Sequence, residues 1–300
     1  MSSSGTHDVT CIPDLEYLHL PGGSWRLDLY VPEGAERPPV VLYLHGGAWV
    51  LGSRKDHQQR LQRLSSAGLA VASIEYRLAH EAAFPAQRED VAAAIDTLRR
   101  VGAQWGLDVG SVGLWGASAG AHLAALIALT LSESSDVDVF ALAGLFGRYD
   151  LTEAGLIPVP DPDLRPPDEI IRAVWPPALF GRPASPMKVR ALLADVDEAH
   201  LDEAALRAIS PVAHLDHGDF PVLLLHGTSD AVTHHAHSER FARAATSSGR
   251  SAELMLVDGA NHEDPWFDGP EAASKLAAFF LRNAPHPARD RIGVSAGAKL

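Results

Sequence analysis

The chain has 300 residues, of which 46% are hydrophobic and 21% charged, and its formal net charge is -13. This composition is typical of a globular protein with a large core, and the acidic balance argues against nucleic acid or an anionic membrane surface as a partner. One cysteine, Cys11, excludes an intrachain disulfide and a cysteine metal cluster. The opening stretch MSSSGTHDVT does not resemble a signal peptide, and no apolar run is long enough for a membrane span, so a cytoplasmic location is expected.

The first half of the chain predicts a strand pair followed by alternating strands and helices. Two alternating runs within 15–35 flank the turn sequence PGGS, which predicts two strands joined by a turn. Continuous apolar runs predict strands buried on both faces at 40–44, 69–78 and 111–118. Amphipathic or apolar helical spacing follows these strands at 58–68, 85–106 and 119–132.

The second half continues the alternation after an irregular insertion. Strands are predicted at 137–147, 220–230 and 252–262, and helices at 237–249 and 269–284. Together these elements predict an α/β fold with a mostly parallel central sheet and helices on both faces. We expect one domain over residues 1–283, with a lid or cap insertion at 150–210, and a flexible tail at 284–300.

Three chemically active side chains directly follow predicted parallel strands. Ser118, Asp230 and His262 stand at these positions, in the chain order serine, acid, histidine. The carboxyl ends of parallel strands meet at one edge of a sheet, where ligands bind. Serine needs a base to act as a nucleophile at neutral pH, and the base needs an acid to orient it. Asp258 is the alternative acid, although its place beside Gly259 favours a turn residue.

The segment Gly116-Ala117-Ser118-Ala119-Gly120 fits the pattern G-x-S-x-G between a strand and a helix. A serine on such a sharp turn holds its hydroxyl out over the sheet, and its neighbours must be small to avoid the adjacent elements. The amides at the start of the following helix favour a developing negative charge. This context predicts that Ser118 is a nucleophile.

The loop after residue 44 reads His45-Gly46-Gly47-Ala48-Trp49 and is expected to stabilise an oxyanion. The N–H groups of Gly47, Ala48 and Ala119 are the predicted donors. His45 is expected to support this loop through a hydrogen bond. Trp49 is expected to pack at the base of the pocket.

Several other polar residues receive structural interpretations. The cluster His234, His235 and His237 has no spacing that supports a metal site, and no metal is expected. His122 is interpreted as a packing or capping residue. Glu263, beside the predicted base, is expected in a solvated position.

The motifs resemble the α/β-hydrolase superfamily, in particular the hormone-sensitive-lipase-like bacterial carboxylesterases. The resemblance covers residues 15–283 and is carried by HGGAW at 45–49, YRLA at 76–79, Phe84-Pro85 with Asp90, GASAG at 116–120, SPVAH at 210–214, HGTSD at 226–230 and NHED at 261–264. Ala48 and Ala117 depart from the usual HGGG and GDSAG patterns. Both departures fit the HGGxW branch, which includes feruloyl-esterase-like enzymes and kynurenine formamidases.

The resemblance implies the same catalytic residues, Ser118, His262 and Asp230, and an α/β-hydrolase fold with a small lid insertion. It implies a serine hydrolase that cleaves small carboxylic esters through an acyl-enzyme, without a metal or organic cofactor. Alternatives are an arylformamidase or other amide hydrolase with the same triad, a lyase or cyclase, and a receptor on the same fold. Lid and pocket residues expected to contact the substrate are Trp49, Tyr149, Trp175 and Phe180. A monomer or a homodimer is compatible with the sequence.

Overall fold

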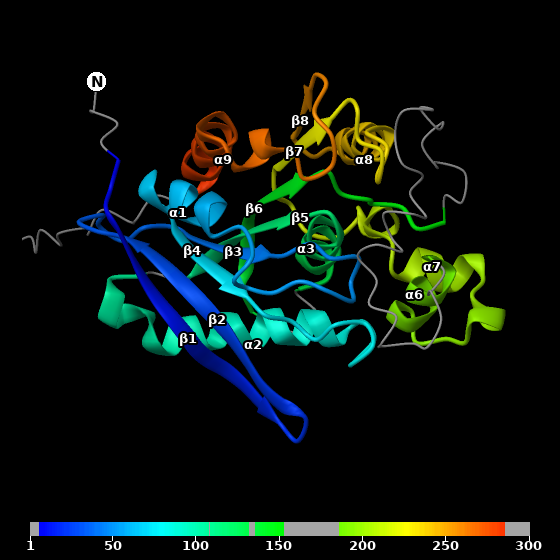
Figure 1. The fold of residues 1–300 in the computed structure, drawn as a ribbon, viewed down its shortest axis with the longest axis horizontal. Helices are drawn as coiled ribbons and strands as arrows, with labels where there is room; N and C mark the ends of the chain where they lie inside the picture. The colour runs from blue at the N-terminus through cyan, green and yellow to red at the C-terminus, as the bar shows by residue number, and fades with distance from the viewer. Residues whose placement is uncertain (1–5, 108, 132–135, 153–185, 286–300) are drawn as a thin grey trace, which may run out of the picture.

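The computed structural model describes residues 6–107, 109–131, 136–152 and 186–285. Eight strands within these ranges form one sheet in the order β1-β2-β4-β3-β5-β6-β7-β8 (Figure 1). All neighbouring pairs from β4 to β8 are parallel, whereas β1 and β2 pair antiparallel. The mostly parallel sheet predicted from the sequence is therefore confirmed. The strands are β1 (Val9–Leu20), β2 (Gly23–Pro32), β3 (Val40–Leu44), β4 (Ala70–Ile74), β5 (Ser111–Ala117), β6 (Asp138–Leu145), β7 (Val222–Gly227) and β8 (Ala252–Val257).

Helices cover both faces of the sheet. The described helices are α1 (Gln58–Ser66), α2 (Ala86–Val101), α3 (Ala119–Thr130), α6 (Pro186–Leu193), α7 (Glu203–Ala208), α8 (Ala236–Ser247) and α9 (Pro270–Asn283). Figure 1 places α1 and α9 on one side of the sheet and α2 on the other. Successive residues of a strand point to opposite faces, so each face has its own apolar cluster. In β3, for example, Leu42 packs toward α2 and α3, while Tyr43 packs toward α1 and α9.

The first strand is longer than the alternating pattern predicts. It begins at Val9 and continues through Pro13, a residue that usually ends a strand. Proline is tolerated here because β1 lies at the edge of the sheet and its register with β2 shifts between Ile12 and Leu15. Asp14, inside this irregularity, has a φ of 59°. An edge strand with a bulge has no simple alternation for a sequence pattern to detect.

Other strands end earlier than predicted, because residues after each buried run belong to loops. β4 ends at Ile74 and β8 at Val257, whereas the apolar patterns extend to 78 and 262. The predicted lid at 150–210 overlaps the undescribed range 153–185, and α6 and α7 follow that range. The predicted tail lies almost entirely outside the described residues.

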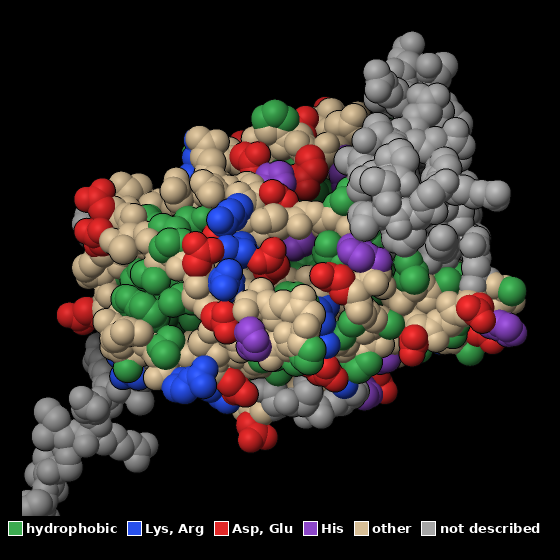
Figure 2. All heavy atoms as spheres, turned by 60° about the horizontal axis from the view of Figure 1, so that its bottom comes forward, with side chains coloured by type: hydrophobic (Ala, Val, Ile, Leu, Met, Phe, Trp, Pro, Cys, Tyr) green, Lys and Arg blue, Asp and Glu red, His purple; other side chains and the backbone are tan. Residues whose placement is uncertain are grey.

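Acidic side chains are widely distributed over the surface. Figure 2 shows Asp and Glu side chains spread across the face in view, with Lys and Arg in small groups between them. Among the helices that the structure describes, none is both long and apolar enough to cross a bilayer.

Candidate active site

Ser118 occupies a sharp turn between β5 and α3. Its backbone has φ 53° and ψ -120°, a conformation that a residue with a side chain rarely adopts. The turn is held by the Ser118 N–H, which donates to the Leu145 carbonyl at 2.9 Å, and by the start of α3. The strained backbone directs the hydroxyl away from the sheet, as expected from the G-x-S-x-G pattern.

Gly116 and Gly120 allow this turn because backbone atoms lie where a side chain would begin. A Cβ on Gly120 would be 2.1 Å from the Leu44 carbonyl oxygen, and one on Gly116 would be 2.2 Å from the Gly120 carbonyl oxygen. Both distances are well inside van der Waals contact. The nucleophile turn and the end of β3 are thus in direct backbone contact.

We expect Gly120→Ala to lower the free energy of unfolding by about 3 kcal/mol, because its methyl group forces β3 and α3 apart. Urea unfolding measures this loss. Gly22→Ala is the matched control, since nothing lies within 4 Å of a Cβ there and its φ is not in the left-handed region. Equal stability of Gly120→Ala and the wild type would contradict the close backbone contact.

His262 lies within hydrogen-bond distance of both Ser118 and Asp230. The His262 Nε2 atom is 3.0 Å from Ser118 Oγ, and His262 Nδ1 is 2.8 Å from Asp230 Oδ2. An ionised carboxylate can only accept, so the Nδ1–H donates to Asp230 and the bare Nε2 accepts from the Ser118 hydroxyl. This tautomer is the one that a general base needs.

Four donors surround the Asp230 carboxylate, whose side chain is fully buried. Oδ1 accepts from the Val232 and Thr233 amides, each at 2.8 Å, and Oδ2 accepts from His262. The Nε2 atom of His226 lies 3.2 Å from the same Oδ2. Burial acts to raise the pKa of Asp230, but His262 and His226 outweigh it and hold that pKa well below its usual range. Asp230 is therefore ionised at neutral pH.

His226 was not identified from the sequence as part of this site. Its ring is completely buried, with Nδ1 2.7 Å from Ser238 Oγ and Nε2 2.8 Å from the Thr233 carbonyl oxygen. Because a carbonyl only accepts, Nε2 carries the proton and also faces Asp230. The motif HGTSD places this histidine four positions before the acid, but the contact between the two side chains exists only once the loop after β7 is folded.

The loop that carries His262 is attached to α1. The Arg60 guanidinium is 2% exposed and donates to Glu263 Oε2 at 2.9 Å and to Asp268 Oδ1 at 2.8 Å. Phe146 packs against the His262 ring with centroids 4.7 Å apart, and Arg60 lies over the same phenyl ring. Glu263 was expected in a solvated position; its side chain is 32% exposed and also pairs with a buried cation from a distant helix.

The predicted oxyanion loop has an unusual backbone. Gly47, Ala48 and Trp49 have φ values of 118°, 50° and 65°, so three successive residues lie in the left-handed region. Within the described part of the chain, no acceptor is bonded to the N–H groups of Gly47, Ala48 or Ala119. Gly46 brings this loop against the nucleophile turn, since its Cβ position lies 3.4 Å from Ser118 Cβ.

His45 supports the loop from below, as its interpretation from the sequence required. Its ring is stacked on Tyr76 at 4.3 Å, Nδ1 is 2.8 Å from the Gly46 carbonyl oxygen, and the Tyr76 hydroxyl donates to the His45 carbonyl. Burial lowers the pKa of His45 to about 4, so the ring is neutral at physiological pH.

Of the four residues expected to contact a substrate, the two that the structure describes lie in different environments. Trp49 is half-buried and donates its indole N–H to His122 Nδ1 at 3.1 Å. Tyr149 is a correction to the prediction, because it is 1% exposed and stacked on Phe241 in the core rather than bordering a pocket. Gly144 and Gly147 leave the space that its ring occupies. Trp175 and Phe180 lie outside the described residues.

Asp258, the alternative acid, and the histidine cluster at 234–237 lie outside the Ser118–His262–Asp230 series. Asp258 is exposed and accepts from Thr228 Oγ1 at 3.2 Å. His234 stacks on His235 with centroids 4.4 Å apart. Among the residues that the structure describes, no group of three or more His, Cys, Asp or Glu side chains has the arrangement of a metal site.

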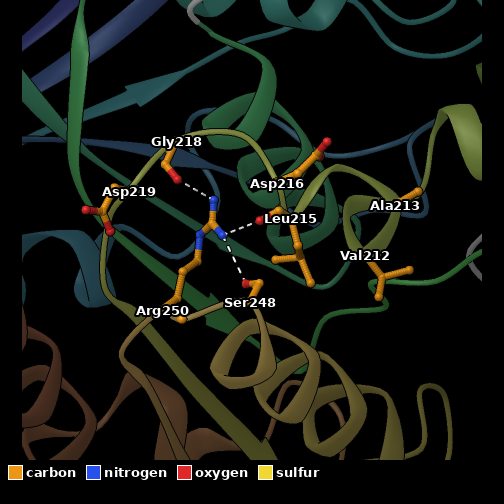
Figure 3. Close-up of a pocket in the computed structure, with 9 residues that line it drawn as sticks. Val212, Ala213, Leu215, Asp216, Gly218, Asp219, Ser248 and Arg250 are labelled. Carbon is orange, nitrogen blue, oxygen red and sulfur yellow. Dashed lines mark hydrogen bonds between the residues drawn. The ribbon is translucent and has the colours of Figure 1, made fainter.

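A separate surface hollow of about 620 Å³ lies near the amino ends of β7 and β8, the opposite edge from Asp230 and His262. Figure 3 shows Arg250 reaching across it toward the carbonyls of Leu215 and Gly218 and to Ser248 Oγ, which lies 3.2 Å away. The guanidinium thus joins the loop before β7 to the turn before β8, a structural role remote from Ser118.

Comparison with known proteins agrees with this architecture. The BD-FAE family model matches residues 27–153, and the prolyl oligopeptidase family model matches residues 193–285. The esterase LipC of Mycobacterium tuberculosis is 30% identical over 254 residues, which cover 81% of this chain and 57% of LipC. A solved esterase from Pyrobaculum calidifontis is 26% identical with a TM-score of 0.66, covering 94% of this chain and 87% of that one. The chain has an α/β-hydrolase fold, and the relatives that it resembles bear esterase names.

Further relatives of this α/β-hydrolase bear related names. A probable isoprenylcysteine alpha-carbonyl methylesterase of Oryza sativa is 28% identical over 265 residues, or 82% of this chain and 56% of the rice protein. A truncated carbohydrate esterase from gut microbiota has a TM-score of 0.69 at 23% identity, covering 94% and 98% of the two chains, and supports the fold. The α/β-hydrolase spans little more than half the length of the first curated relatives, 56% and 57%.

Proposed function

We propose that this protein hydrolyses small carboxylic esters through an acyl-enzyme, with Ser118 as nucleophile, His262 as base and Asp230 as orienting acid. The observation that carries the proposal is the unbroken hydrogen-bonded series from Ser118 Oγ through the His262 ring to Asp230, with distances of 3.0 and 2.8 Å. The esterase names of the relatives point to the same chemistry.

In the first half of the proposed cycle, Ser118 Oγ attacks the ester carbonyl carbon while its proton passes to His262 Nε2. Asp230 stabilises the resulting imidazolium through the Nδ1–H. The N–H groups of Gly47, Ala48 and Ala119 receive the negative charge on the former carbonyl oxygen, and each such donor is worth on the order of 3–4 kcal/mol of barrier. Collapse of the tetrahedral intermediate breaks the bond to the alcohol, which leaves with the proton from His262.

In the second half, water replaces the alcohol. His262 removes a proton from water, the hydroxide attacks the acyl carbon, and the second intermediate collapses to the carboxylic acid and free Ser118. The Ser118 oxygen recovers its proton from His262. This cycle consumes one ester and one water and uses neither a metal nor an organic cofactor.

Hydrolysis of p-nitrophenyl esters, from acetate to long acyl chains, tests the proposal. We expect turnover with a burst of p-nitrophenol equal to the enzyme concentration whenever deacylation is the slower step. Mass spectrometry after treatment with a fluorophosphonate should place one adduct on Ser118. A folded wild type that neither hydrolyses any ester nor takes up the probe would contradict the proposal. Cleavage of N-formylarylamines but not esters would reassign the same residues to an amide hydrolase.

A further inference from the structure

The oxyanion loop needs support that its own sequence does not supply. Ala48 and Trp49 both have side chains and both adopt positive φ values, 50° and 65°. Residues other than glycine adopt such angles at a cost of order 1–3 kcal/mol each, and they persist only where surrounding contacts hold them. The contacts that hold these two residues therefore decide where the loop amides point.

The Trp49 side chain supplies the most specific of these contacts. Its indole N–H donates to His122 Nδ1 at 3.1 Å, and the two rings meet nearly at right angles, at 88°. The Trp49 carbonyl also accepts from the Ala79 N–H at 2.8 Å, which holds the backbone from the other side. The indole thus connects the loop to α3, because His122 lies in the first turns of that helix.

The surroundings of His122 leave its Nδ1 atom free of a proton, so that it can accept this hydrogen bond. Its ring is completely buried, and Nε2 lies 2.7 Å from the Ile209 carbonyl oxygen. Because a carbonyl only accepts, Nε2 carries the proton, and the bare Nδ1 is left facing the indole N–H. Burial lowers the pKa of His122 to about 4, so the neutral ring and this tautomer persist at physiological pH.

The same helix carries the nucleophile and one proposed oxyanion donor. Ser118 and Ala119 stand at the start of α3, and His122 follows in the same helix. Any movement of the loop relative to α3 would change the separation between the Ala119 amide and the loop amides. A bond from Trp49 to His122 fixes that separation.

We propose that Trp49 and His122 are positioning residues for the oxyanion hole, acting through the indole N–H to Nδ1 hydrogen bond. Neither touches the reacting atoms. The inference rests on the proposed ester hydrolysis and adds to it a role for two side chains outside the triad. It also replaces the interpretations of Trp49 as a substrate contact and of His122 as simple packing.

Trp49→Phe tests the role of the indole N–H, since it removes the donor and keeps an aromatic ring. We expect kcat to fall by about tenfold while KM changes less than about twofold, because an oxyanion hole acts mainly in the transition state. Trp105→Phe is the matched control, at another half-buried tryptophan in the 3-10 turn Gly102–Trp105 after α2. It should leave kcat unchanged.

His122 variants test the other partner. An asparagine oxygen can occupy the position of Nδ1, so His122→Asn should retain most of kcat, whereas His122→Leu should lose as much as Trp49→Phe. The double variant Trp49→Phe with His122→Leu should be no slower than either single variant, since both remove one interaction. A transition-state mimic such as a boronic acid should bind each impaired variant about tenfold more weakly, while the product carboxylate binds equally.

The outcomes separate this inference from the proposed function. An active wild type with an unimpaired Trp49→Phe variant would overturn the inference alone. Equal losses in affinity for the boronic acid and the product would also overturn it, because they indicate general damage to the site. A wild type that is inactive toward esters and unlabelled by the fluorophosphonate would overturn both proposals.

Discussion

Ser118→Ala is expected to reduce kcat for ester hydrolysis by on the order of 10⁶-fold while the protein stays folded. The substitution deletes the proposed nucleophile and the hydroxyl proton that His262 would accept. Alanine and serine have similar backbone preferences, so the turn with φ 53° is no more strained than before. The assay uses p-nitrophenyl acetate, with thermal unfolding followed in parallel.

Ser66→Ala provides the control for Ser118→Ala. Ser66 is a half-buried serine at the end of α1, and its hydroxyl donates only to the Arg63 carbonyl at 2.9 Å. We expect this variant to keep wild-type activity. Substantial turnover by a purified Ser118→Ala variant would show that another group performs the attack.

Asp230→Asn is expected to reduce kcat by about 10⁴-fold. The carboxylate fixes the proton of His262 on Nδ1, whereas an amide can donate to Nδ1 and so favour the tautomer with the proton on Nε2. That tautomer presents a donor to Ser118 and cannot accept its proton. Asp258→Asn is the matched control, because Asp258 is exposed and accepts from Thr228 in the loop nearby. A larger loss in Asp258→Asn than in Asp230→Asn would exchange their roles.

The loss of stability caused by Asp230→Asn is expected to depend on pH. The pKa of Asp230 is lower in the folded protein than the usual value of about 3.9, so the ionised group stabilises the fold above that pH. This stabilisation is lost progressively as pH falls below the usual value. The difference in urea midpoint between wild type and Asp230→Asn should therefore be larger at pH 7 than at pH 3. An equal difference at both pH values would contradict the lowered pKa.

Sequence patterns predicted the parallel sheet because its central strands are buried on both faces. The runs VVLYL in β3 and VLLLHG in β7 are almost entirely apolar, and both form strands where predicted. The edge strand β1 was underestimated, since Pro13 and a register shift interrupt any alternation. Burial on two faces leaves a clear signature in sequence, whereas an edge strand does not.

Some residues of the candidate site could likewise be identified from the sequence, and others could not. Ser118, Asp230 and His262 could be selected because each follows a strand whose end must reach one edge of the sheet. Arg60 and Glu263 could not, because 203 positions separate them and each resembles a surface charge in its own segment. Tyr149 was misplaced because its position just after a predicted strand suggested the border of a pocket, whereas Gly144 and Gly147 admit its ring into the core.

The attachment of the His262 loop to α1 has a consequence for protein synthesis. Arg60 is translated 203 residues before its partner Glu263, and His262 is translated directly before Glu263. A nascent chain that ends before this loop contains Ser118 without His262, the proposed base. Under the proposed mechanism, the serine stays unactivated until all eight described strands have been translated, and the ion pairs with Arg60 form after that.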